Sequence, residues 1–117
     1  MKQKKGTNLA ELSLRDRIVE ILEDRKAEAI EVISIKERST LTDDFIICNG
    51  TSNTHVRALT DELIRRLEVE DGLEPLHEEG RDSNRWVLLD YGPVIVHIFH
   101  PEEREFYSLD KLWRRSN

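Results

Sequence analysis

Apolar residues in the first half of the chain recur with two different spacings. Leu14, Ile18 and Ile21 follow one another at helical intervals, behind a Ser13 and Asp16 pair of the kind that caps helices. The next apolar stretch is short, β-branched and alternating, and a later one is continuous, as in a central strand covered on both faces. These patterns predict a helix over residues 14–27, a strand over 29–35, a loop over 36–42 and a strand over 43–49.

The second half of the chain combines one long helix with a hairpin. Gly50 breaks the preceding strand, Ser52 is placed to cap a helix, and Gly72 marks the end of that helix. A Gly92-Pro93 pair stands between two apolar runs, which is typical of a hairpin turn. The predicted elements are a helix from Ser52 through Glu68, an edge strand over 74–79, a turn over 80–84, hairpin strands over 85–91 and 94–99, a helical turn from Pro101 and a short helix over 109–113.

Helices and strands alternate along the chain, which favours an α/β (α+β) fold with helices packed on a mixed sheet of about five strands. The 117 residues suit one domain. We predict a flexible basic arm over residues 1–8 and a single domain over 9–117. No signal peptide or membrane span is recognised, so a cytoplasmic location is expected. The single cysteine, Cys48, excludes an internal disulfide.

The balance of charge bears on the class of partner. The chain has a net charge of −6, with 24 acidic against 18 basic residues. An acidic chain is a poor ligand for a nucleic-acid backbone, which is bound through lysine and arginine clusters. Acidic pairs such as Asp43-Asp44 are either ordinary solvated positions or a means of steering a basic protein partner.

The final third of the chain carries both Trp, both Tyr and two of the three Phe, and the hairpin within it is apolar on both faces. Alternation places Trp86, Leu88 and Asp90 on one face of the first strand and Val87, Leu89 and Tyr91 on its other face. On the second strand it separates Val94, Val96 and Ile98 from Ile95, His97 and Phe99. Two apolar faces in a small protein mean either that both are covered or that one receives a partner. Incomplete cover near Trp86, Tyr91 or His97 and plain core packing therefore both remain open.

The turn at Gly50, Thr51 and Ser52 invites an enzymatic interpretation. A glycine and serine between a strand and a helix are placed where nucleotidyltransferases hold a triphosphate. That chemistry needs two magnesium ions and alternating carboxylates on a nearby strand, yet Asp90 has only Leu88 and Gly92 at its same-face positions. The sequence therefore favours Ser52 as a plain helix cap.

The histidines and the cysteine do not assemble a metal site in the sequence. His97 and His100 are three positions apart on a strand and do not share a face, and zinc requires three or four converging ligands. Cys48 lies in an apolar run and is most simply a small core side chain. We expect no metal and no cofactor.

Two long segments stand out, and they are Thr42–Ser52 with the following Val56-Arg57-Ala58, and Trp86–Phe99 followed by Glu103–Trp113. Both resemble the ribosomal silencing factor S family, also called Iojap-like. The resemblance extends from about Ile18 to Trp113. It implies a small α/β protein with a mixed sheet, related in fold to nucleotidyltransferases but degenerate, without their metal ligands. It further implies a non-enzymatic homodimer.

The resemblance also implies a function and a site. Family members bind the large ribosomal subunit through its universal protein L-fourteen, block joining of the small subunit and lower translation when nutrients are scarce. The corresponding contact residues here are Trp86, Asp90, Tyr91 and His97, with Asp43 and Asp44 as acidic neighbours. Pro93 stands where the family often has aspartate, so any polar contact there is altered.

The residues and the resemblance leave three functions to distinguish. The first is a ribosome-binding translational repressor that acts by steric competition, without specificity for nucleic acid and without a membrane role. The second is a nucleotidyltransferase using Gly50, Ser52 and Asp90, which the absent second carboxylate disfavours. The third is a dimeric scaffold with no ribosomal role. A dimer that hides the apolar hairpin would make self-association compete with docking.

Overall fold

The computed structural model describes residues 13–37 and 40–107, and this part contains three helices and five strands. It confirms the predicted class, an α+β fold with a five-stranded mixed sheet. The basic arm over 1–8 and the helix expected over 109–113 lie outside the described residues, and the single domain over 9–117 stays a prediction. In chain order the elements are α1 (Leu14–Asp24), β1 (Glu28–Ser34), β2 (Asp44–Asn49), α2 (Asn53–Asp71), β3 (His77–Glu79), β4 (Trp86–Asp90), β5 (Val94–Phe99) and α3 (Pro101–Tyr107).

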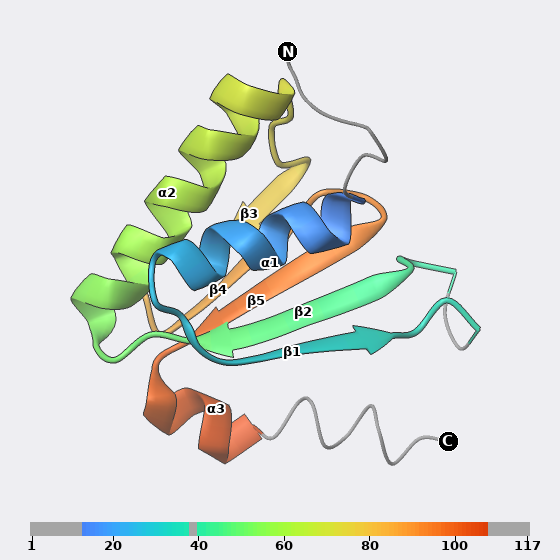
Figure 1. Ribbon diagram of the computed structural model, residues 1–117. Coiled ribbons are helices and arrows are strands. Elements are labelled where there is room, and N and C mark those ends of the chain that lie inside the picture. The colour runs from blue at the N-terminus through green and yellow to red at the C-terminus, as the bar shows by residue number, and fades with distance from the viewer. Residues whose placement is uncertain (1–12, 38–39, 108–117) are drawn as a thin grey trace.

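The sheet has the strand order β1-β2-β5-β4-β3. Strands β2 and β5 pair in parallel at its centre, and every other neighbouring pair is antiparallel (Figure 1). The predicted hairpin is confirmed as β4 and β5, with Trp86 opposite Phe99 and Asp90 opposite Ile95. The parallel pair places the first residues of β2 beside the hairpin turn.

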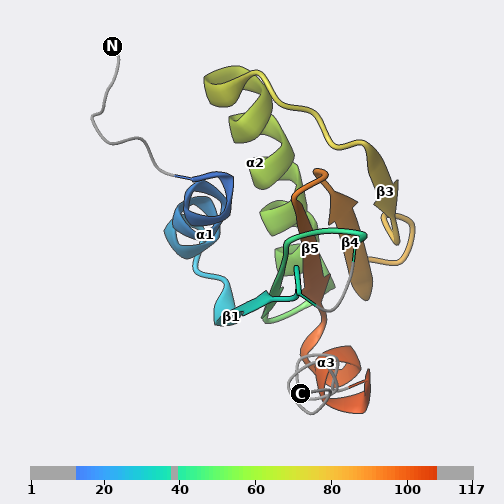
Figure 2. The same cartoon turned by 90° about the vertical axis from the view of Figure 1, so that its right-hand side faces the viewer.

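Helices α1 and α2 cover one face of the sheet (Figures 1 and 2). Helix α3 is not part of this layer and lies past the end of β5. The sequence pattern explains this layer, because α1 and α2 turn their apolar stripes toward alternate residues of the strands. The main core holds Ile18, Ile21, Leu22, Ile46, Cys48, Val56, Leu59, Leu63, Leu67, Val87, Leu89, Tyr91, Val94, Val96 and Ile98.

The opposite face of the sheet carries a second apolar cluster. It consists of Ile33, Ile35, Phe45, Ile47, Ile95 and Phe99, with Trp86 and Leu88 packed against it. None of the six is more than 6% exposed. The predicted alternation along each hairpin strand is therefore confirmed, and the cluster residues of both faces are buried or half-buried.

Both long helices begin with the serine caps that the sequence predicts, but they end elsewhere than predicted, α1 at Asp24 and α2 at Asp71. Ser13 Oγ accepts from the backbone N–H of Asp16, and Ser52 Oγ accepts from that of His55, each at 3.1 Å. Gly72 ends α2 in the left-handed region, with φ of 70°. Helix α1 stops at Asp24 rather than continuing to residue 27, because Lys26 adopts a φ of 64°, which no helix can accommodate.

Candidate functional site

The turn that joins β4 to β5 is held by the segment that leads into β2. Thr42 Oγ1 donates to the carbonyl of Gly92 at 2.8 Å, and the backbone N–H groups of Asp43 and Asp44 both donate to the carbonyl of Pro93 at 3.1 Å. Gly92 has a φ of 94°, a conformation that side-chain-bearing residues rarely adopt. Two segments half a chain apart therefore form one fixed end of the sheet.

Asp90 and Leu76 complete this end of the sheet. Asp90 Oδ1 accepts from the backbone N–H of Gly92 at 2.8 Å, which braces the turn, and the carbonyl of Asp90 accepts from the backbone N–H of Leu76 at 2.7 Å. A methylene of Gly92 faces Leu76, since a Cβ built on the glycine would lie 3.6 Å from Leu76 Cδ1. Residues before β2, before β3 and after β4 thus meet around a single turn.

The side chains that surround this turn are a mixture of exposed apolar groups and carboxylates. Leu41 is 73% exposed and Leu76 is 75% exposed, and Pro93 and Asp43 are also exposed. Asp44 is more shielded and lies 3.9 Å from the Arg15 guanidinium. We call this region the turn-end surface and define it as Leu41, Leu76, Pro93, Asp43, Asp44 and Asp90.

Four ring-bearing side chains form a separate group on the second face of the sheet. The indole of Trp86 lies 4.9 Å from the ring of Phe99, and the His97 ring lies 4.9 Å from that of Phe45, edge to face. Trp86 Nε1 donates to His97 Nδ1 at 3.1 Å. We call Phe45, Trp86, His97 and Phe99 the aromatic cluster. Such ring pairs stabilise beyond the area that they bury.

His97 is neutral and buried within this cluster. It is 4% exposed, and burial lowers its pKa to about 4 because an imidazolium would be desolvated there. Since Nδ1 accepts from Trp86, the proton sits on Nε2, and Nε2 has no hydrogen-bond partner in the described part of the chain. Among the alternatives left open by the sequence, core packing is confirmed for His97.

Tyr91 is also a core residue, but on the other face. It is 7% exposed and packs with the residues beneath α1 and α2. Its hydroxyl is buried without a hydrogen-bond partner among the described residues, and burial, with the charge of Glu78 adding to it, raises the pKa of the phenol above its ordinary value. Of the two alternatives that the sequence left open, core packing therefore holds for the side chain of Tyr91.

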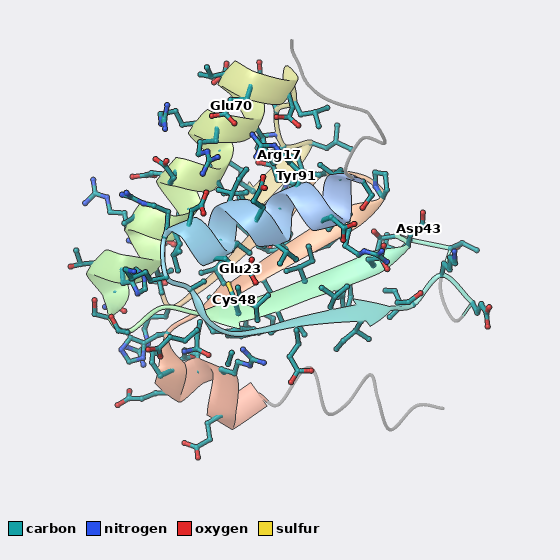
Figure 3. The ribbon with its side chains drawn as sticks, viewed as in Figure 1. Arg17, Glu23, Asp43, Cys48, Glu70 and Tyr91 are labelled. Atoms are coloured by element: carbon teal, nitrogen blue, oxygen red, sulfur yellow. The ribbon has the colours of Figure 1, made fainter. Side chains whose placement is uncertain are left out.

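The six residues expected to contact a partner thus fall into three places. Asp43, Asp44 and Asp90 gather at the turn, Trp86 and His97 lie together in the aromatic cluster, and Tyr91 enters the main core. Figure 3 shows Asp43 just before β2 and Tyr91 well apart from it, toward α1. The carboxylates and the aromatic cluster do not form one continuous set of exposed side chains.

The aromatic cluster adjoins helix α3, which is fixed by two arginines. Arg85 forms ion pairs with Glu102 at 3.0 Å and with Glu103 at 2.9 Å. Arg104 donates to the carbonyl of Ala29 at 2.6 Å and to Asn49 Oδ1 at 3.2 Å. These contacts join α3 to both the hairpin and the β1–β2 pair.

In the turn after β2, three backbone N–H groups already have acceptors within the chain. The backbone N–H of Gly50 donates to Phe99, that of Thr51 to His55 Nδ1, and that of His55 to the Ser52 cap. A shallow depression of about 490 Å³ lies here, and acidic as well as basic side chains line it. Ser52 is a helix cap, as the sequence favoured, and these N–H groups are already satisfied.

Metal and thiol chemistry find no support in the described residues. Within residues 13–37 and 40–107, no three His, Cys, Asp or Glu side chains converge as a metal site would require. Burial raises the pKa of the Cys48 thiol to about 12, so it stays protonated and unreactive. None of the helices in the part that the structure covers could span a bilayer.

Leu41 and Leu76 are the surface residues that the sequence analysis missed. Leu41 lies in the predicted loop over 36–42, and Leu76 lies in the predicted edge strand over 74–79 but, in the structure, in the loop just before β3. Large apolar residues inside such loops are the signal that could have identified them, because a loop gives them no core to enter.

Comparisons with known proteins agree on one family. A family model described as "Ribosomal silencing factor during starvation" matches residues 8–117. A ribosomal silencing factor of Halalkalibacterium halodurans is 42% identical over 95 residues, which is 81% of this chain and 80% of that protein. A mouse protein named "Mitochondrial assembly of ribosomal large subunit protein 1" is 34% identical, over 84% of this chain and 44% of its own length.

A solved structure supports the same conclusion. A crystal structure from Chromobacterium violaceum superposes with a TM-score of 0.80 at 31% identity, and the match covers 87% of each chain. Fold and sequence therefore agree along most of the length. The chain belongs to the ribosomal silencing factor family.

Proposed function

We propose that this protein is a translational repressor that binds the large ribosomal subunit through the universal protein L-fourteen and blocks association with the small subunit. Membership of the ribosomal silencing factor family supports a ribosomal role. The name of the mouse relative points to the large subunit. The observation that carries the proposal is the fixed turn end, where three carboxylates stand beside exposed apolar side chains.

The proposed mechanism is steric and requires no reaction. A protein that occupies the face used by the small subunit lowers translation for as long as it stays bound, so no catalytic group is needed. An acidic surface with apolar contacts is complementary to a basic protein and is repelled by bare RNA. The N–H groups of Gly50, Thr51 and His55, which already have acceptors within the chain, support a role that is not enzymatic.

The six predicted contact residues take different parts in this proposal. Asp43, Asp44 and Asp90 meet the partner directly because they stand at the turn end. Trp86 and His97 act through the hairpin, since their hydrogen bond and ring contacts fix where β4 and β5 lie. Tyr91 acts in the same indirect way from the main core.

The proposal includes a homodimer in the cytoplasm. The resemblance to the family is its basis, and the acidic composition opposes nucleic-acid binding by the free protein. No described residue takes part in a membrane-spanning helix, and we propose no membrane role.

Subunit joining tests the proposed function. Purified large and small subunits are mixed with increasing amounts of the full chain, and whole ribosomes are followed by light scattering and by sucrose-gradient sedimentation. We expect the factor to co-sediment with the large subunit and whole ribosomes to decrease as it saturates. Unchanged joining at saturation would contradict repression, and magnesium-dependent binding of nucleoside triphosphates would favour the enzyme instead.

A further inference from the structure

The second face of the sheet is buried, although helices α1 and α2 lie on the other face (Figure 2). Ile47 and Phe99 are 0% exposed, and Ile35 is 1% exposed. The apolar cluster on this face consists of strand residues and of Ile35, which follows β1, and it includes no residue of α1 or α2. Side chains stand perpendicular to a sheet, so neighbouring strands cannot shield them from above. A further layer must therefore cover this face.

Helix α3 lies at only one end of this face. Phe99 is the last residue of β5, and Ile95, near the start of β5, pairs with Phe45. These two ends are about 13 Å apart, because a strand rises about 3.3 Å per residue. Helix α3 lies past the Phe99 end, where Arg85 and Arg104 hold it (Figure 1). The cover over Ile95 and Phe45 therefore comes from another part of the chain.

Three segments lie outside the described residues, namely 1–12, 38–39 and 108–117. Residues 1–12 precede α1, which belongs to the layer on the opposite face. Residues 38–39 are too few to form a layer. Residues 108–117 directly follow α3 at the Phe99 end, and at about 1.5 Å per residue a helix of this segment would be about 15 Å long. Of the three segments, 108–117 is thus the one that starts beside this face and is long enough to cross it.

The sequence of this segment fits an apolar partner layer. Leu109, Leu112 and Trp113 have the spacing of a single helical stripe, and a short helix is predicted over 109–113. Lys111 and Arg114 fall outside that stripe. An amphipathic segment of this kind gains stability by placing its apolar side on an apolar surface.

We propose that residues 108–117 of this chain dock on the second face of the sheet. Leu109, Leu112 and Trp113 pack against the apolar cluster between Phe99 and Ile95, which completes a helix layer on each side of the sheet. The His97 ring lies in this cluster, in edge contact with Phe45, so the docked segment also separates His97 from solvent. This docking does not depend on a ribosomal role.

Nuclear Overhauser contacts in the full-length wild type test the docking directly. We expect contacts from the Trp113 indole to the methyl groups of Ile47 and Ile95, which face the second side of the sheet. Contacts from Trp113 to Ile46 or Val96 of the main core instead, or none to the sheet, would overturn the proposal.

A mixture of labelled and unlabelled chains identifies which copy supplies the cover. With isotope filtering, we expect the Trp113 contacts to arise within one chain. Contacts that arise only between two chains would assign the cover to a second copy and would overturn docking within the chain.

A pair of double variants measures what the docking contributes to stability. Leu109→Ser/Trp113→Ser removes two apolar side chains from the stripe, and we expect the midpoint of urea denaturation to fall by about 1 M or more. The opened face should also bind the dye ANS. Lys111→Ser/Arg114→Ser is the matched control and should keep the wild-type midpoint without dye binding.

Equal midpoints for the two double variants would contradict the docking, because the apolar stripe would then bury nothing. If Leu109→Ser/Trp113→Ser does not fold at all, the contacts of Trp113 in the wild type decide between docking and its absence.

Discussion

The aromatic cluster and the turn-end surface belong to the same hairpin but have opposite characters. The cluster is rich in ring-bearing side chains, and they are buried or half-buried, with Trp86 hydrogen-bonded to His97 and in tilted ring contact with Phe99. The turn-end surface has no aromatic residue among its defining six, and two of its leucines are almost wholly exposed. A concentration of aromatics in the sequence therefore marked the packing of the domain, while the exposed surface lies elsewhere.

The comparison makes a general point about reading such hairpins. Aromatic residues are favoured in both cores and interfaces, so their number alone does not distinguish the two. What distinguishes them here is exposure together with a fixed backbone. A change in the aromatic cluster should therefore reduce the free energy of unfolding, and a change at the turn-end surface should reduce binding to the large subunit.

The largest expected effect is on stability, at Tyr91. Its ring is buried in the main core, so Tyr91→Ala should lower the free energy of unfolding by about 3 kcal/mol or more, as other large core truncations do. Tyr91→Phe is the matched control. It removes only a buried hydroxyl without a partner in the described part, so stability should stay equal or rise slightly. Urea denaturation measures the free energy of unfolding of both variants. A Tyr91→Ala variant as stable as the wild type would contradict the burial of Tyr91.

The next largest effect is expected at Trp86. Trp86→Ala should lower the free energy of unfolding by about 2–3 kcal/mol, since the ring is half-buried and its removal leaves His97 Nδ1 without its donor. Subunit binding, measured at a temperature where the variant is folded, should then change far less than stability. A folded Trp86→Ala protein of unchanged stability that no longer binds large subunits would break the comparison, because the cluster would then be an interface.

The dependence of stability on pH probes the cluster through His97. The folded pKa of about 4 lies below the ordinary value of 6.5, so between these pH values the unfolded chain binds a proton that the folded chain excludes. Stability contributed by this group is complete above pH 6.5 and is lost as the pH falls toward 4, with a loss of about 2 kcal/mol between pH 7 and 5. His97→Phe should flatten that part of the curve. If the stability of the wild type and of His97→Phe fell in parallel over this pH range, His97 would be accessible to protons in the folded protein.

The smallest expected effect is at Asp90. Asp90→Asn keeps an oxygen acceptor for the N–H of Gly92, so the free energy of unfolding should change by less than about 0.5 kcal/mol. The association rate with large subunits should fall severalfold at low salt, and the difference should vanish at high salt. Asp82→Asn, in the turn between β3 and β4, removes the same charge away from the turn end and should have no such effect.

Much of this fold could be predicted because its signals are local. The caps at Ser13 and Ser52 follow from side-chain chemistry at a single position, and the two faces of the hairpin follow from a period of two. The family resemblance also emerged from contiguous segments, and the family comparisons confirm it.

The remaining features depend on contacts between distant parts of the chain. Alternation indicates that Ile95, His97 and Phe99 share a face, but not whether that face is covered, so the burial of His97 was left open. Tyr91 could not be assigned for the same reason. The turn-end surface arises only when the parallel pairing of β2 with β5 brings residues 42–44 beside Gly92, and no local pattern contains that pairing.

The central parallel pair also has a consequence for how the chain is made. Strand β2 finds its partner β5 only after α2, β3 and β4 have been synthesised, and about half the chain separates the paired residues. Until then Phe45, Ile46, Ile47 and Cys48 remain an apolar edge without its inner neighbour, a situation that favours aggregation of incomplete chains. Cotranslational folding of this domain should therefore stall until β5 has left the exit tunnel, and nascent chains that end before Val94 should depend on chaperones.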